Sequence, residues 1–256
     1  MAGRTTWRSP SVAPVDLTLA VLLVAGIGVL VGAAVQGAVG MGLGLIGAPV
    51  LALLDPPLVP GTILLVTSVL PMLTSVREME DVDWRGLSWA LLGRLPGLLI
   101  GAWVVVTQPA RVTAVVVAVV VLGAVALSVT SWHARPTPRA LLVAGVVSGV
   151  SGTATSIGGP PVATLYQHAS GATLRSTMGL YFLVGNVLSG SALALAGEIG
   201  GREVLRALAL LPFLLVGFLL SGPLRGRVDG GALRVAVLVL SAAGALVLLV
   251  RTLLSG

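Results

Sequence analysis

Two stretches rich in glycine and proline lie inside otherwise apolar blocks, and they resemble each other. The first is GAVGMGLGLIGAP, from Gly37 to Pro49, and the second is GVSGTATSIGGPP, from Gly149 to Pro161. At an offset of 112 residues (149 minus 37), the coincident pairs are Gly37/Gly149, Gly40/Gly152, Gly47/Gly159 and Pro49/Pro161. Paired interruptions of apolar segments at matching places predict the binding site of a secondary transporter.

The composition places these stretches in a membrane. The 256-residue chain is 56% hydrophobic and only 9% charged, whereas a soluble domain carries about 25% charged residues. Eight apolar blocks cover residues 17–54, 58–76, 86–107, 111–131, 139–167, 173–197, 203–222 and 231–253. A single helix over 17–54 would be about 57 Å long, far beyond a bilayer. We therefore expect an all-α polytopic protein with about eight transmembrane segments, in which blocks 17–54 and 139–167 break at their glycine motifs.

The charged residues limit the possible partners. All 15 basic residues are arginines, scattered singly between apolar blocks, which argues against nucleic-acid binding and favours a role in membrane topology. The absence of cysteine excludes thiolate metal sites and disulfides, and we expect no cofactor. No nucleotide-binding loop is found, so this chain alone does not drive transport with ATP. The sequence leaves open whether copies associate into a homo-oligomer.

The sequence also indicates an internal duplication. Leu95-Pro96-x4-Gly101 recurs as Leu211-Pro212-x4-Gly217. We expect an N-terminal tail (1–16), a first transmembrane repeat (17–131), a linker (132–138) and a second repeat (139–256). With four spans in each repeat, nine arginines fall on the cytoplasmic side and five outside, which favours cytoplasmic termini and repeats of like orientation.

The two motifs predict an anion site made of backbone. Proline is preorganised for the first position of a helix, so helices are expected to begin near Pro160 or Pro161, and near Pro49. Their free N–H groups would then face the glycine loops and attract an anion. Close helix packing by small residues is the alternative explanation. The candidate substrate-binding residues of the motifs are Gly40, Gly42, Gly44, Gly47 and Pro49, with Gly152, Thr153, Ser156, Gly158, Gly159 and Pro160.

Two further polar residues lie inside predicted spans. Arg94 stands about eight residues into a span, where a cation is costly and usually faces a cavity or a partner. Its guanidinium suits an anionic substrate, although it could instead extend toward the headgroups. Asn186 could line the path or bond to another helix, and Gln36 and Tyr166 are weaker candidates.

These features together resemble the sulfite exporter TauE/SafE family of bacterial permeases. The residues that carry the resemblance are Gly37-x2-Gly40-x-Gly42-x-Gly44 with Pro49, Asp83-Trp84-Arg85, and Gly149-x2-Gly152 with Gly158-Gly159-Pro160-Pro161. The resemblance covers most of residues 17–253, although the first motif has fewer glycines than is usual in the family. It implies a non-enzymatic exporter of sulfite, organosulfonates or related small anions across the inner membrane of a bacterium.

Two other functions are compatible with parts of the sequence. Gly149-Val-Ser151-Gly152 matches the nucleophile loop of an intramembrane serine protease, which needs a base within hydrogen-bonding distance. The two histidines, His133 and His168, lie near block ends, which disfavours that function. A membrane subunit that does not transport would leave Arg94 and the duplicated breaks without a role.

Overall fold

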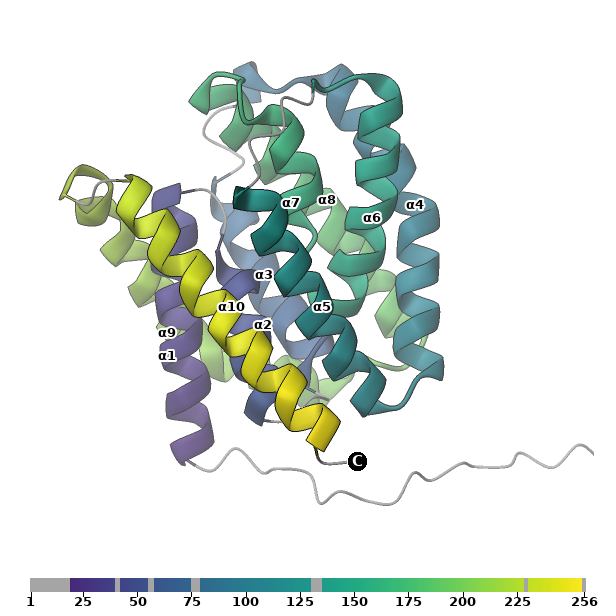
Figure 1. Ribbon diagram of the computed structural model, residues 1–256, viewed down its shortest axis with the longest axis vertical. Coiled ribbons are helices and arrows are strands. Elements are labelled where there is room, and N and C mark those ends of the chain that lie inside the picture. Colours follow the sequence, from purple (N-terminus) through teal and green to yellow (C-terminus); the bar gives the residue numbers. More distant parts are fainter. Residues whose placement is uncertain are drawn as a thin grey trace, which may run out of the picture.

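The protein is an all-helical bundle (Figure 1). The computed structural model describes residues 19–39, 42–54, 58–74, 79–129, 135–227 and 230–254, and contains no strand in these ranges. The expected tail (1–16), residues 132–134 of the expected linker and Gly40 lie outside the described residues. In chain order the elements are α1 (Leu19–Val39), α2 (Leu43–Leu54), α3 (Gly61–Thr74), η2 (Met79–Asp81), α4 (Trp84–Thr107), α5 (Ala110–Val129), α6 (Pro138–Thr155), α7 (Gly159–Ala163), η3 (Thr164–Tyr166), α8 (Gly171–Leu195), α9 (Gly201–Arg227) and α10 (Gly230–Leu254).

The bundle has the character of a polytopic membrane protein. Among the described residues, five helices are long and apolar enough to cross a membrane: Leu19–Gly37, Trp84–Thr107, Ala110–Leu127, Gly171–Leu195 and Gly201–Gly222. Shorter apolar helices cover Leu43–Leu54, Gly61–Met72 and Ser241–Leu254. Large apolar side chains such as Leu99, Trp103 and Leu219 are exposed on the outside, as a lipid-facing surface requires.

Both predicted breaks are present. The first long block separates into α1 and α2, and the second separates into α6 and α7. In the second block the new helix begins at Gly159, next to the expected prolines. In the first block the expectation was wrong, because α2 begins at Leu43 and Pro49 lies inside it. Gln36 accepts a hydrogen bond from the Leu43 N–H at 3.1 Å and so caps the earlier helix start.

Glycines let two pairs of helices pack at very short range. On α4, Gly93 and Gly97 face backbone carbonyls of α6, so a side chain at either position would collide with Leu142 or Val146. On α9, Gly217 meets the backbone of α1 at Leu30 in the same way. Such contacts between small residues are a common basis of helix association in membranes. In both pairs the contacting residue numbers rise together, since Gly26 of α1 also meets Phe213 of α9, so the paired helices are parallel.

The start of α9 lies at the lower end of the bundle in Figure 1. A side chain on Gly61, at the start of α3, would touch Glu198 and Glu203, which flank the start of α9. At the upper end, the Asp83 N–H before α4 donates to Thr177 in the first turns of α8. The helices α9 and α4 therefore begin at opposite ends of the bundle. Because α1 is parallel to α9 and α6 is parallel to α4, α1 and α6 also run in opposite directions.

This arrangement corrects the expectation of repeats with like orientation. That expectation counted residues 17–54 as one crossing. In the structure α2 turns back along α1, because a side chain on Gly32 would touch Leu43 and one on Gly28 would touch Val50. The extra reversal places the start of α6 at the end opposite to the start of α1 (Figure 1).

Single cysteines can test the direction of the helices, since the chain has none of its own. We expect Ala110→Cys and Gly201→Cys to react with an impermeant thiol reagent from the same side, and Pro136→Cys only from the other side. All three positions are exposed, and a side chain on Gly201 meets no atom within 4 Å. Repeats of like orientation would instead place Ala110 and Gly201 on opposite sides.

Ser156, which ends α6, has a left-handed backbone conformation, with φ 60° and ψ 17°. Glycine is the usual residue at such a helix end, because any side chain makes this conformation costly by about 1–2 kcal/mol. The Ser156 hydroxyl contributes little to the protein in return, since its bond to the Pro60 carbonyl is 3.5 Å long. The serine therefore reduces the stability of the fold.

We expect Ser156→Gly to raise the free energy of unfolding by about 1 kcal/mol, which for a chain of this size is about 2–4 °C in Tm. Thermal unfolding of the purified protein measures the effect. Ser156→Ala is the matched control, because it removes the hydroxyl but keeps the side chain that makes the backbone costly. Equal stability of the glycine and alanine variants would contradict the assignment of strain.

Candidate substrate site

The two broken segments meet inside the bundle. Gly44, in the first turn of α2, faces the carbonyl oxygen of Ser156 so closely that a Cβ on Gly44 would lie 2.6 Å from it. Just before Gly44, Gly42 has φ +154°, and its carbonyl accepts the first helical hydrogen bond, from the Ile46 N–H at 3.0 Å. Glycine at these positions allows the two chain segments to come together.

Side chains hold the second loop in place. The Thr155 hydroxyl accepts a hydrogen bond from the Ile157 N–H at 3.3 Å. Ser148 donates to the Gly158 carbonyl, and Tyr181 donates to the Ser148 hydroxyl at 2.7 Å. The short helix α7 begins at Gly159, and the two prolines that follow it have no N–H. The expected backbone donors at this helix start are therefore reduced mainly to the glycines before the prolines.

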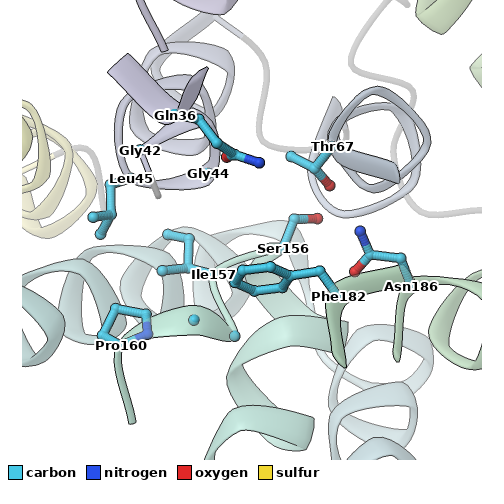
Figure 2. A pocket seen from close by; sticks show the side chains of 12 residues that line it. Gln36, Gly42, Gly44, Leu45, Thr67, Ser156, Ile157, Pro160, Phe182 and Asn186 are labelled. Carbon is cyan, nitrogen blue, oxygen red and sulfur yellow. The ribbon is translucent and has the colours of Figure 1, made fainter. Parts of the chain in front are cut away.

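A pocket lies where the two loops meet (Figure 2). It is lined by Gln36, Gly42, Gly44, Leu45, Thr67, Ser156, Ile157, Gly158, Gly159, Pro160, Phe182 and Asn186. Figure 2 shows the polar ends of Gln36, Thr67, Ser156 and Asn186 directed toward the same space, from α1, α3, the second loop and α8. The amides of Gln36 and Asn186 and the Ser156 hydroxyl can donate hydrogen bonds there, and none of the lining residues is ionisable.

Asn186 is the lining residue whose side chain is most available to a ligand. Its side chain is only 8% exposed and points into the pocket (Figure 2). Among the described residues it has no hydrogen-bond partner, whereas Thr67 already bonds to the Leu64 carbonyl at 3.0 Å. Because this amide faces the pocket space, it is free to donate a hydrogen bond to a ligand there.

The structure brings together seven of the predicted site residues. Those that line the pocket are Gly42, Gly44, Ser156, Gly158, Gly159, Pro160 and Asn186. Gly47 faces Ile63, which a Cβ would approach to 2.9 Å, and Pro49 lines a separate apolar groove between α1, α2 and α10. Arg94, Gly152 and Thr153 lie behind the second loop. Gly40 is outside the described residues.

Sequence reasoning missed Thr67 and Phe182 as lining residues. A signal was present, because Leu65-Val-Thr-Ser-Val-Leu70 in α3 and Leu183-Val-Gly-Asn-Val-Leu188 in α8 share Leu-Val-x-x-Val-Leu. This match pairs Thr67 and Ser68 with Gly185 and Asn186. Comparing the two stretches would have placed a polar residue of α3 opposite Asn186.

The geometry gives no support to a serine nucleophile. Ser151 is buried in α6, about 20 Å along the axis from its start at Pro138. Its hydroxyl lies 3.4 Å from the Ser148 carbonyl of the same helix. His168 is exposed just beyond η3, at the end where α4 and α6 begin, and His133 lies outside the described residues.

Comparison with known proteins identifies the family. No curated protein and no solved structure matches the chain. A family model described as "Sulfite exporter TauE/SafE" matches residues 24–248, which include both glycine motifs and every residue that lines the pocket. The match confirms the resemblance seen in the sequence, and the chain belongs to the sulfite exporter TauE/SafE family.

Proposed function

We propose that this protein is a secondary transporter that exports sulfite, organosulfonates or related small oxyanions across the inner membrane of a bacterium. Family membership supports the general activity. The pocket at the junction of the two broken segments supports the choice of a small polar substrate. Irregular backbone at membrane depth is tolerated where it is buried in protein or lines a cavity, and the described non-helical residues Gly42 and 156–158 line the pocket.

The observation that carries the proposal is the set of neutral donors around one space. Oxyanions carry several acceptor oxygens, and hydrogen bonds to a charged acceptor are roughly twice as strong as neutral ones. Asn186, Gln36 and Ser156 offer such donors at the pocket, whereas the Thr67 hydroxyl donates to the Leu64 carbonyl. The first turn of α2 adds backbone N–H groups and the positive end of a 12-residue helix. Because these groups carry no charge, they hold the anion less tightly than a cation in direct contact would, so the anion can be released.

We further propose that the two repeats form inverted halves with the pocket between them. The helix pairs α1–α9 and α6–α4 support this, since α4 and α9 carry the repeated Leu-Pro-x4-Gly motif. Packing of α3 against α8 and of α5 against α10 gives further pairs of matching helices. Inverted halves around a central site are a common basis of alternating access.

Transport in proteoliposomes tests the proposed function. We expect purified protein to release trapped sulfite or methanesulfonate faster than empty liposomes do, and to discriminate against a large anion such as gluconate. Wild-type vesicles no more permeable to sulfite, sulfate, methanesulfonate or acetate than empty ones would overturn the proposal.

Asn186→Ala should weaken anion binding by roughly 10–150-fold, because a hydrogen bond to a charged group contributes about 1.5–3 kcal/mol. The thermal stability without anion should change little, since the amide faces the pocket and makes no hydrogen bond to another described residue. Sulfite-dependent thermal stabilisation reports the affinity. Ser88→Ala, at an exposed hydroxyl of α4, is the control. Unchanged affinity in Asn186→Ala would exclude this amide from the site.

Gly44→Ala should separate the two loops, because its Cβ would lie 2.6 Å from a backbone oxygen that cannot rotate away. We expect at least a tenfold loss of transport and a destabilisation of about 1–3 kcal/mol, as is usual for overpacking. Gly123→Ala is the matched control, since a Cβ there meets nothing within 4 Å. Wild-type transport by Gly44→Ala, at equal membrane expression, would show that transport does not need this contact.

A further inference from the structure

Arg94 is a buried cation that lacks a counter-ion in the described part of the chain. Its side chain is 1% exposed, in the middle of α4. Its Nε and Nη1 atoms have no hydrogen-bond partner, and Nη2 reaches only the Ser189 hydroxyl, at 3.5 Å. The described carboxylates form no ion pair with it. A charge in this condition is expensive, so its presence needs a physical explanation.

The surroundings of Arg94 are shaped to hold the guanidinium. Its Cζ atom lies 5.0 Å from the ring centre of Tyr181, a favourable cation–π arrangement. Side chains on Gly152, Gly158 and Gly185 would each press against the guanidinium. The glycines come from α6, the second loop and α8, so three separate segments leave room for this one group. A residue that simply extended toward the headgroups would need no such space.

The guanidinium lies directly behind the pocket. Gly158 lines the pocket, and a Cβ on Gly158 would lie 3.2 Å from Nη1 of Arg94. Arg94 itself is absent from the pocket lining, so a single glycine backbone separates the cation from the ligand space. The contact between the guanidinium fork and the substrate that the sequence suggested is therefore not the arrangement found.

We propose that Arg94 is the counter-charge of the bound anion, acting across the Gly158 backbone without touching it. This inference rests on the proposed function. It divides recognition in two: the neutral groups of the pocket select for shape and hydrogen bonding, whereas Arg94 selects for negative charge. A Coulomb interaction across one peptide layer in a low-dielectric interior is strong and depends little on the orientation of the charged group.

Three variants separate this role from direct contact and from a structural role. Arg94→Leu removes the charge and introduces the residue found at the corresponding position in α9, Leu210. Arg94→Lys keeps the charge but loses the planar fork. Arg206→Gln, at the start of α9 and paired with Glu203 at 3.9 Å, controls for the loss of one positive charge elsewhere.

The measurement is thermal stabilisation of the purified protein by sulfite, methanesulfonate, acetate or chloride, each titrated against gluconate. We expect Arg94→Leu to weaken stabilisation by the effective anions at least tenfold, and Arg94→Lys and Arg206→Gln to stay within about threefold of wild type. Without these anions, Arg94→Leu should be at least as stable as wild type, because an uncompensated buried charge has been removed.

Each other outcome has a definite meaning. Unchanged anion affinity in Arg94→Leu, or no stabilisation of wild type by any of the four anions, overturns the inference. A loss in Arg94→Lys as large as in Arg94→Leu overturns action at a distance and favours direct contact by the fork. Stabilisation that depends on Arg94 in a protein without transport activity leaves the inference standing and removes only the proposed function.

Discussion

Backbone that leaves the helical pattern inside a bilayer must find its hydrogen-bond partners within the protein, because lipid offers none. At both breaks, a described backbone group finds such a partner in a side chain of the helix before the break. Gln36 of α1 caps the Leu43 N–H, and Ser148 of α6 binds the Gly158 carbonyl, with Tyr181 behind it. Gln36 and Ser148 are also 112 residues apart, so the two breaks are supported from matching positions. These hydrogen bonds hold the two loops so that they face each other, and the pocket lies between them.

Sequence patterns predicted the breaks well and the direction of the helices poorly. Glycine and proline interrupt helices for local steric reasons, so the breaks and most pocket-lining glycines could be read from the chain. Whether α2 turns back along α1 depends on close contacts such as Gly28 with Val50, which no local rule predicts. The expectation of a helix start near Pro49 was wrong for a similar reason, because Gln36, seven residues before Leu43, caps the earlier start at Leu43.

The same difference between local rules and contacts among distant segments explains what could be predicted for the polar residues. Asn186 and Arg94 could be singled out because polar groups inside spans are rare and costly. Their surroundings could not be read from the chain, since they are set by three or more segments. Asn186 faces the pocket, whereas Arg94 lies behind Gly158. Position 94 and Leu210, its counterpart in the repeated Leu-Pro-x4-Gly motif, also differ in charge, so the two copies of this motif are electrically different.

The packing of α1 against α9 has a consequence for biosynthesis. About 160 residues separate the end of α1 at Val39 from the start of α9 at Gly201, and a ribosome adds about 5–20 residues per second. The face of α1 that packs against α9 is therefore made roughly 10–30 seconds before its partner. During that interval the nascent chain resides in the membrane without its final packing, so insertion and folding are separate events for this protein. Assembly of the bundle is complete only when the last two helices have arrived.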